Sequence, residues 1–303
     1  MTYEHGPTAE RMPAWLARPI TTPGRNAAVE QTLDELHLNT VCRSARCPNR
    51  GECYASGTAT FLIMGDACTR GCRFCAVDTR VPGPLDPGEP RRLAEAASRM
   101  GLSHVVVTTV TRDDLPDGGA AHFVAVVEAL RAAVPEARIE VLTSDFAGDL
   151  EAVDLVADAA PDVFNHNMET VVRLYPTVRP GADYERSLAV LARVKERHPH
   201  MPTKSGLMLG LGETGDEVEA VMRDLRANRV DLLTLGQYLR PSAKHLPVAE
   251  FVAPERFAEL RALGYEMGFA AVASAPFVRS SYHAGELSDQ AREDGTAAQV
   301  QAS

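Results

Sequence analysis

Three features are missing from this sequence, and each absence excludes a class of protein. No apolar run in the 303 residues approaches the roughly 20 residues that a membrane-spanning helix needs, so we expect no membrane partner. The first residues lack the basic segment and apolar core of a secretory signal, which favours a cytoplasmic location. Positive charge is also scarce: 31 Lys and Arg face 41 Asp and Glu, for a net charge of −10. Because nucleic-acid binding relies on Lys and Arg, we expect no nucleic-acid partner.

The overall composition is that of a globular protein. Hydrophobic residues make up 45% of the chain and charged residues 24%, which excludes collagen-like, disordered and disulfide-scaffold classes. The length is sufficient for one α/β barrel or for two smaller domains.

Cysteine is absent from most of the chain. All six cysteines lie between Cys42 and Cys75. Buried structural cysteines would be scattered among core positions, so this clustering marks the segment in which function is to be sought.

From about residue 58 onward, short apolar runs alternate with amphipathic stretches of helical length. The expected strands are Thr60–Met64, His104–Thr109, Arg138–Leu142, Val163–Asn165, Lys204–Leu209 and Leu232–Gln237, followed by a short apolar run at Phe269–Ala273. The expected helices are Asn26–Leu36, Pro90–Met100, Ala120–Ala133, Leu150–Ala159, Tyr184–Arg197, Asp216–Asn228 and Pro254–Met267.

Six such βα repeats predict an α/β fold with a parallel sheet, specifically a partial (β/α)6 TIM-type barrel, with a doubly wound sheet as the rival. We expect three parts: an N-terminal extension (1–57) whose cysteine segment is loop, the barrel core (58–275), and a C-terminal extension (276–303) whose polar end, from residue 286, is a frayed tail.

The cysteines form two motifs of three. Cys68, Cys72 and Cys75 have the spacing C-x3-C-x2-C directly after the first expected strand, whereas Cys42, Cys47 and Cys53 have the spacing C-x4-C-x5-C. Three thiolates on one short segment can converge on a metal or an iron–sulfur cluster. Disulfides and two zinc sites are the alternatives; the first is disfavoured by the expected location, and the second needs an additional ligand at each site.

The motif that ends in Phe74-Cys75 resembles the signature of the radical S-adenosylmethionine (SAM) enzymes. The additional upstream motif, together with Arg279-Ser280-Ser281-Tyr282 near the C-terminus, resembles the lipoyl synthase family. Further segments that match the family are Arg112–Leu115, Asp117–Gly119, Phe164–Thr170, Thr203–Glu213 and Gln237–Pro241.

The resemblance implies two [4Fe–4S] clusters and SAM as cofactors. Cys68, Cys72 and Cys75 would hold the cluster that binds SAM, and an auxiliary cluster would be held by Cys42, Cys47, Cys53 and the oxygen of Ser281. The residues implied to contact SAM are Phe74, Gly118, Gly119, Asn165, Asn167, Glu169 and Met208. Candidate substrate-binding residues are Arg173, Lys204, Arg240 and Arg279, and for each the alternative is an ordinary solvated cation.

The implied activity is that of a sulfurtransferase, which inserts sulfur at C6 and C8 of an octanoyl chain carried on a lysine. The auxiliary cluster would be the sulfur donor. The implied partners are octanoylated lipoyl domains of 2-oxoacid dehydrogenase complexes, the glycine-cleavage H protein, and an electron donor such as flavodoxin or ferredoxin. Two rivals remain at this point: a methylthiolating radical SAM enzyme and a zinc-binding interaction protein.

Overall fold

The structure is a computed structural model that describes residues 12–16, 27–44, 47, 49–55, 58–282 and 284–290. Within this part of the chain, eight strands form one sheet in the order in which they occur in the sequence. The strands are β1 (Asn39–Thr40), β2 (Thr58–Ile63), β3 (His104–Thr109), β4 (Arg138–Leu142), β5 (Val163–Asn165), β6 (Thr203–Leu209), β7 (Leu232–Gln237) and β8 (Ala271–Ser274).

Strands β2 to β8 are parallel, and only β1 is antiparallel, pairing with β2. A doubly wound sheet reverses its strand order at a switch point. Here the order never reverses, so the sheet curls in one direction as a barrel does. The expected partial barrel is confirmed, with a seventh parallel strand following the sixth βα unit.

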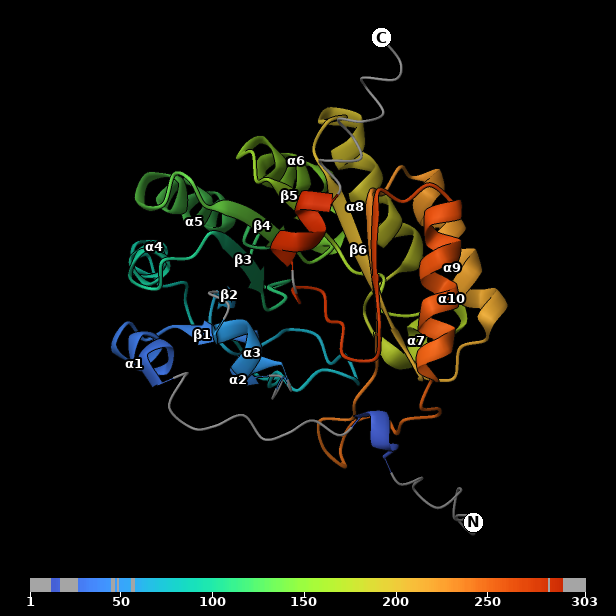
Figure 1. The fold of residues 1–303 in the computed structure, drawn as a ribbon. Coiled ribbons are helices and arrows are strands. Elements are labelled where there is room, and N and C mark those ends of the chain that lie inside the picture. The colour runs from blue at the N-terminus through green and yellow to red at the C-terminus, as the bar shows by residue number, and fades with distance from the viewer. Residues whose placement is uncertain are drawn as a thin grey trace.

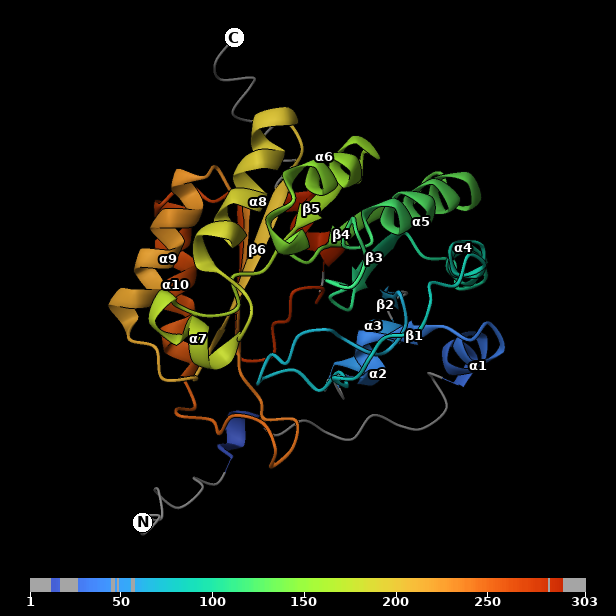
Figure 2. The same cartoon turned by 180° about the vertical axis from the view of Figure 1, so that it is seen from behind.

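Helices on the outer face of the curved sheet connect its strands (Figures 1 and 2). They are α4 (Glu89–Arg99), α5 (Ala120–Ala133), α6 (Leu150–Asp158), α8 (Tyr184–Arg197), α9 (Gly215–Ala227) and α10 (Pro254–Glu266). The shorter helices are α1 (Ala27–Glu35), α2 (Val41–Ser44), α3 (Arg50–Ala55), α7 (Tyr175–Val178) and the 3₁₀ turns η1 (Ala14–Leu16), η2 (Phe146–Gly148) and η3 (Val172–Leu174).

Helix starts carry the local signals that the sequence suggests. At α9 the side chain of Thr214 accepts from the Glu217 amide, and the Glu217 carboxylate accepts in turn from the Thr214 amide, which forms a capping box. Asp149 and Asp183 accept from first-turn amides of α6 and α8 in the same manner.

Two expectations about local structure were wrong. The segment around the first cysteine motif contains the short helices α2 and α3 rather than only loop. Residues 284–290 form a helix instead of a frayed tail, because Leu287 packs against Val163, Leu232 and Ala271, which begin three of the parallel strands. This C-terminal helix therefore closes the amino-terminal end of the barrel, and residues 291–303 lie outside the described residues.

A charged pair lies inside the barrel. Lys204 on β6 is fully buried and its ammonium lies 2.9 Å from Oε1 of Glu140 on β4, which is also buried. Burial alone would raise the pKa of Glu140, but the Lys204 ammonium and the His104 imidazole outweigh burial and lower it to about 2. The pair is therefore ionised at neutral pH.

We predict that Lys204→Met lowers the free energy of unfolding by about 3–5 kcal/mol at pH 7, because it leaves the Glu140 carboxylate buried without its cation. Urea denaturation of the cluster-free chain measures the change. The double variant Glu140→Gln/Lys204→Met should recover most of the loss. An equal loss in the double variant would show that packing, and not charge, is responsible.

The pH dependence of this deficit has a defined sign. The folded-state pKa of Glu140 is depressed, so its contribution is present above the ordinary carboxyl range and is lost as the pH falls from about 4.5 towards 2. The Lys204→Met variant lacks that contribution. Its deficit should therefore shrink over the same pH window.

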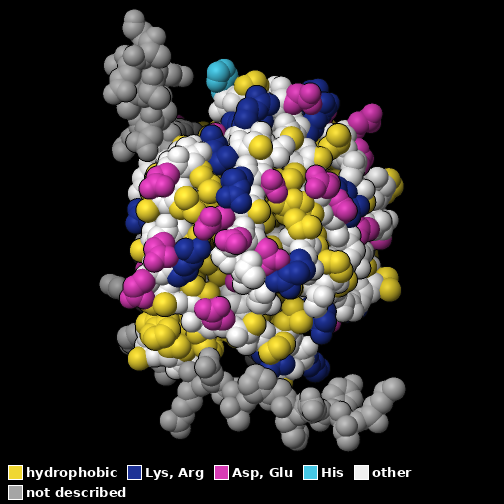
Figure 3. Space-filling view, turned by 90° about the vertical axis from the view of Figure 1, so that its right-hand side faces the viewer, with side chains coloured by type: hydrophobic (Ala, Val, Ile, Leu, Met, Phe, Trp, Pro, Cys, Tyr) yellow, Lys and Arg dark blue, Asp and Glu magenta, His cyan; other side chains and the backbone are white. Residues whose placement is uncertain are grey.

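The outer surface mixes charges of both signs. Figure 3 shows the face that includes α9 and α10, on which acidic and basic side chains are interspersed with small apolar areas. Arg256 on α10 pairs with Glu219 on α9 at 3.3 Å and with Glu259 at 3.0 Å. Among the helices in the described ranges, none is both long and apolar enough to cross a bilayer.

Candidate active site

The Cys68–Cys75 loop lies at the carboxyl ends of the parallel strands. The Cys68 amide donates to the carbonyl of Asp78, and the Thr111 amide beyond β3 faces the Cys68 sulfur at 3.3 Å. The Arg73 amide donates a hydrogen bond to the carbonyl of Val178 on α7, and the Arg73 carbonyl accepts one from the Leu246 amide. Contacts from three separate parts of the barrel therefore fix the loop that carries the second cysteine motif.

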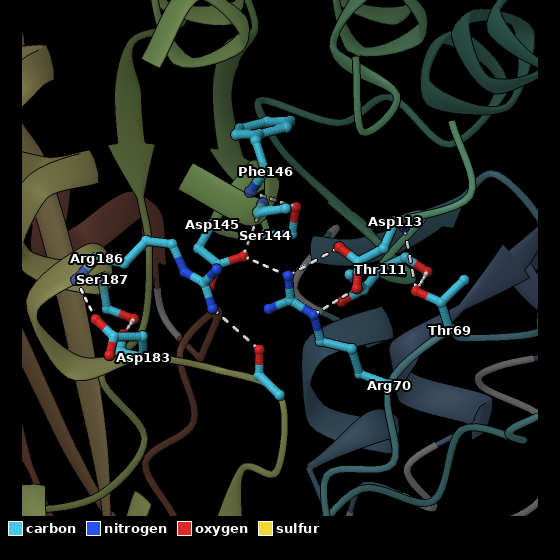
Figure 4. Close-up of polar contacts among 12 residues, drawn as sticks. Thr69, Arg70, Thr111, Asp113, Ser144, Asp145, Phe146, Asp183, Arg186 and Ser187 are labelled. Carbon is cyan, nitrogen blue, oxygen red and sulfur yellow. Dashed lines mark hydrogen bonds and ion pairs between the residues drawn. The ribbon is translucent and has the colours of Figure 1, made fainter. Parts of the chain in front are cut away.

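Arg70, between Cys68 and Cys72, is the main side-chain anchor of this loop (Figure 4). Its guanidinium binds both carboxylate oxygens of Asp113 at 2.7 and 2.8 Å and reaches Oδ1 of Asp145 at 2.7 Å. Asp145 is buried and also pairs with Arg186 of α8, at 2.9 Å. A bidentate, largely buried arrangement of this kind restricts the arginine to one geometry. The network therefore ties the cysteine loop to the ends of β3 and β4 and to α8.

The thiols of the loop are half-buried and close enough to influence one another. Burial, with smaller contributions from the neighbouring Cys72 and Cys68, raises the pKa of Cys75 to about 12. Burial likewise raises the pKa of Cys72, while Arg179 opposes this rise. Three thiolates in such a place require a cationic group to stabilise them, which iron supplies. The donor set therefore fits an iron–sulfur cluster.

The first cysteine motif lies beside the C-terminal Arg-Ser-Ser-Tyr segment. Burial, with a smaller contribution from Cys47, raises the pKa of Cys42 on α2, and the neighbouring Thr60 partly offsets this rise. The hydroxyl of Thr60 donates to Ser281 Oγ at 2.7 Å. Thr60 thus lies beside both the most buried cysteine of the motif and the predicted oxygen ligand.

Two further contacts hold these distant segments together. Asn49 Nδ2 donates to the carbonyl of Phe277 at 2.6 Å, and the Tyr282 hydroxyl donates to Glu52 at 2.8 Å. Asn49 and Glu52 lie between the second and third cysteines of the motif. These contacts bring the segment that contains Ser281 to the first cysteine motif, and the chemistry of these donors, three thiols and a hydroxyl, fits the predicted cluster.

Neither motif has the geometry of a single-ion site. Within the described part of the chain, no three Cys, His, Asp or Glu side chains lie close enough together to bind one metal ion. In a [4Fe–4S] cluster each thiolate binds a different iron, so its ligands are spaced more widely than those of zinc.

Gly118 and Gly119 form the tight turn that begins α5, beside the cysteine loop. Both have positive φ, +58° and +90°, and Asp117 Oδ1 accepts from the Gly119 amide at 2.9 Å. A Cβ on Gly119 would lie 2.2 Å from the sulfur of buried Met64. The positive φ values are strained for any residue other than glycine, so the turn requires glycine at these positions.

We predict that Gly119→Ala raises the KM for SAM at least about tenfold, because a 1–3 kcal/mol backbone strain and the Met64 clash displace the turn. Steady-state kinetics of SAM cleavage measures the change. Gly101→Ala is the matched control, since Gly101 also has positive φ (+60°) but has no neighbour within 4 Å of the added Cβ and lies at the far end of α4. A KM for Gly119→Ala equal to that of the control would contradict the assignment.

The polar residues predicted at the end of β5 lie together. Asn167 Nδ2 donates to Glu169 Oε1 at 3.0 Å, and burial raises the pKa of Glu169, an effect that Arg179 partly offsets. Asn165 Oδ1 is buried and has no hydrogen-bond partner among the described residues. Such an orphaned acceptor fits a ligand that donates a hydrogen bond, as the ribose hydroxyls of SAM can. The Met208 amide on β6 donates to the Glu169 carbonyl, which joins the fifth-strand and sixth-strand segments.

The remaining predicted residues have diverse surroundings. Phe74 is half-buried within the cysteine loop. Arg173 is exposed and paired with Glu217 at 2.7 Å, and Lys204 is held by Glu140, so each has an intramolecular partner. Arg240 donates to the carbonyls of Ala243 and His245 in its own turn. Arg279 donates to the carbonyl of Val278 at 2.6 Å. The structure thus favours a structural role for the buried Lys204, whereas Arg173, Arg240 and Arg279 stay predicted contacts with substrate.

Several residues of the site were not predicted. Arg70, Asp145 and Thr60 are examples, and their sequence signal is weak because each is defined by neighbours that are distant along the chain. His245 is another: its Nε2 lies 3.0 Å from the Cys75 carbonyl. A sequence search could have noted only that Arg70 lies inside the cysteine motif.

Comparisons with known proteins agree with this arrangement. The family profile described as the radical SAM superfamily matches residues 62–225. "Lipoyl synthase" of Caldanaerobacter subterraneus subsp. tengcongensis is 58% identical over 274 residues, which covers 90% of this chain and 96% of that protein. "Lipoyl synthase" of Nitrosococcus oceani is 57% identical over 281 residues, with 92% and 87% coverage.

Solved structures support the fold. The FeFe-hydrogenase maturase HydG of Carboxydothermus hydrogenoformans superposes with a TM-score of 0.56 at 12% identity, covering 88% of this chain and 78% of that one. Methylornithine synthase gives 0.54 at 14% identity, with 84% and 86% coverage. The profile, the two close relatives and the paired cysteine motifs agree: the chain belongs to the lipoyl synthase family within the radical SAM superfamily.

Proposed function

We propose that this chain inserts sulfur at C6 and C8 of a protein-bound octanoyl-lysine, with the auxiliary cluster as the sulfur donor. The observation that carries the proposal is the set of hydrogen bonds that bring the C-terminal segment to the first cysteine motif: Thr60 to Ser281, Asn49 to Phe277 and Tyr282 to Glu52. It supports a second cluster site built from residues at opposite ends of the chain. A methylthiolating enzyme and a zinc protein are less favoured, since the close relatives bear the lipoyl synthase name over nearly the whole chain.

Each cluster has its own set of ligands. Cys68, Cys72 and Cys75 would bind three irons of one cluster and leave the fourth for the amino and carboxylate groups of SAM. When bound, this cluster and SAM supply a carbon radical that can remove hydrogen from an unactivated C–H bond, which acid–base catalysis cannot do.

The protein's own residues position and shield these groups. Arg70 and Thr111 orient the cysteine loop, and the glycine turn at Gly118-Gly119 supplies backbone groups beside it. Asn165, Asn167 and Glu169 would contact the SAM ribose and methionine groups. Arg173, Arg240 and Arg279 remain proposed contacts for the octanoyl-lysine carrier.

The three-part organisation is likewise a proposal. In it, the extension 1–57 supplies the auxiliary cysteines, the core 58–275 supplies the barrel, and the extension 276–303 supplies Ser281. The pairing of β1 with β2 and the contacts of Asn49 with Phe277 and of Glu52 with Tyr282 support an arrangement in which both extensions dock on the core.

Partners and location follow from the same activity. A lipoyl synthase acts on lipoyl-carrier proteins, and we propose the lipoyl domains of 2-oxoacid dehydrogenases and the glycine-cleavage H protein. Flavodoxin or ferredoxin would supply electrons. We place the activity in the cytoplasm, where reducing conditions keep cysteines unpaired, as all six are here.

The deciding experiment uses the anaerobically reconstituted chain, an octanoyl-lysyl peptide, SAM and a reductant, with mass spectrometry of the peptide. We expect a dithiolated product and about eight irons and eight sulfides per chain. Zinc without sulfide, or SAM cleavage without any thiolated peptide, would contradict the proposal.

A further inference from the structure

The two serines of the C-terminal motif have different neighbours. The segment that contains them runs from β8 through the space between the two halves of the sheet to the helix 284–290 (Figure 1). Ser281 faces Thr60 on β2, whereas the hydroxyl of Ser280 lies 2.8 Å from Asn165 Nδ2 and 3.2 Å from Asn167 Oδ1. Consecutive residues thus contact Thr60, near the auxiliary motif, and two of the predicted SAM contacts.

The direction of these hydrogen bonds is fixed. Asn165 Nδ2 has two hydrogens, which it donates to Glu140 Oε1 at 2.9 Å and to Ser280. Ser280 therefore accepts from Asn165, and its single hydrogen is available for Asn167 Oδ1. Both functions of the hydroxyl are used. A carbon side chain could make neither bond.

The hydrogen bonds extend in both directions from Ser280. On one side, Asn165 is anchored through Glu140 to the buried Lys204 ammonium. On the other side, Asn167 Nδ2 donates to Glu169, another of the predicted SAM contacts. These hydrogen bonds form one continuous series, which runs from Lys204 through Glu140, Asn165, Ser280 and Asn167 to Glu169.

The backbone around the motif is also constrained. The Pro276 carbonyl accepts from the Gln237 amide at 3.2 Å, and a Cβ on Gly236 would lie 2.1 Å from the Val278 carbonyl. Residues 276–278, just before the two serines, therefore pack closely against β7. Because Pro276 and Val278 are held against β7 and Ser280 is hydrogen-bonded to Asn165 of β5, the position of Ser281 opposite β2 is restricted.

We propose that Ser280 is a positioning residue that holds Ser281 beside the auxiliary cysteines and couples it, through Asn167, to the SAM-binding side of the barrel. This inference rests on the proposed function for the identity of the two sites. A ligand that engages the Asn167 amide acts on the same hydrogen bond that holds Ser280. Binding at one site is thereby communicated to the oxygen ligand of the other.

The first test uses the cluster-free full chain, so that no cofactor is required. In Ser280→Ala, backbone amide exchange across residues 279–282 should accelerate about tenfold, as expected for the loss of hydrogen bonds that hold the segment. Ser280→Thr keeps the hydroxyl and should exchange at the parental rate. Ser288→Ala is the matched control, because Ser288 is a buried serine of the same C-terminal extension whose hydroxyl has no partner among the described residues.

The second test uses the reconstituted chain and Mössbauer spectroscopy with and without SAM. Ser280→Ala should keep about eight irons per chain but lower the fraction of oxygen-ligated iron about tenfold, and the auxiliary-cluster spectrum should no longer respond to SAM. Ser281→Ala removes the oxygen ligand itself and serves as the reference for complete loss.

The outcomes separate the inference from the proposed function. Parental exchange and a parental spectrum in Ser280→Ala, or equal acceleration in Ser288→Ala, would overturn the role of Ser280. If the parental chain shows no oxygen-ligated iron and Ser281→Ala changes nothing, the assignment of the auxiliary cluster fails instead. In that case the exchange measurement still decides whether Ser280 positions the segment.

Discussion

Cys72→Ala is expected to reduce SAM cleavage at least about 10³-fold, because it removes one of the three proposed cysteine ligands of the SAM-binding cluster, and these ligands act as a unit. Iron should fall from about eight to about four per chain, since the auxiliary motif keeps all of its ligands. Release of 5′-deoxyadenosine under reducing conditions, together with iron and sulfide analysis, measures both effects.

The separation of the two cysteine motifs makes this prediction selective. The Cys68–Cys75 loop is held by Thr111, by the Arg70 network and by the turn that contains His245. The auxiliary motif depends instead on Thr60 and the C-terminal segment. Loss of all iron in Cys72→Ala, or SAM cleavage that persists with eight irons bound, would contradict the assignment of two clusters with separate ligands.

Arg70→Lys tests how much the loop anchor contributes to that cluster. Lysine keeps the charge but loses the bidentate bond to Asp113 and the simultaneous contact with Asp145. We expect the cluster to form but SAM cleavage to fall roughly 10–100-fold, as for residues that orient metal ligands. A rate equal to that of the parental chain would show that the backbone contacts alone position the loop.

Much of the barrel was predictable from the sequence because its signals are local. The strands His104–Thr109, Arg138–Leu142 and Leu232–Gln237 have the bounds that the apolar runs suggest, and α5 and α8 have the bounds that periodicity suggests. In these elements most apolar side chains are buried, although buried polar residues such as Glu140 interrupt the pattern. The bounds of such elements require no knowledge of distant neighbours.

The features that were not predicted depend on contacts between distant residues. Helix 284–290 has a polar composition, and it is ordered because Leu287 meets the first residues of three strands. The sequence suggested that Lys204 binds substrate. In the structure it forms an ion pair inside the barrel with Glu140, which lies two strands away in the sheet. Neither outcome can be read from the residues adjacent in the sequence.

The site was predicted unevenly for the same reason. The cysteines are adjacent in the sequence, so their spacing alone indicated two groups of three. That Ser281 lies at the auxiliary motif came only from family resemblance, and the structure supports it through Thr60, which no pattern singled out. The hydrogen bonds of Ser280 were not predicted, since they join β5 to a segment that follows β8.

Cys53→Ala is expected to abolish formation of dithiolated peptide, with a loss of at least about 10³-fold, while SAM cleavage stays within about threefold of the parental rate. Cys53 lies on α3, which packs beside β2. The backbone amide of Cys53 donates a hydrogen bond to the Asn49 carbonyl, and neither contact involves the Cys68–Cys75 loop. Removing it disables the sulfur source without altering the group that attacks the C–H bond. 5′-Deoxyadenosine should therefore still accumulate, uncoupled from thiolated product.

Comparison with Ser281→Ala makes this result informative about the sulfur donor. Ser281→Ala keeps all three auxiliary thiolates, so iron should remain near eight per chain, whereas Cys53→Ala should lower it towards four. If the auxiliary cluster is the sulfur source, Cys53→Ala must lose dithiolated peptide together with that cluster. This holds even when the SAM-binding cluster is intact. Thiolated peptide formed by Cys53→Ala at the parental yield, with only four irons bound, would mean that the sulfur comes from elsewhere.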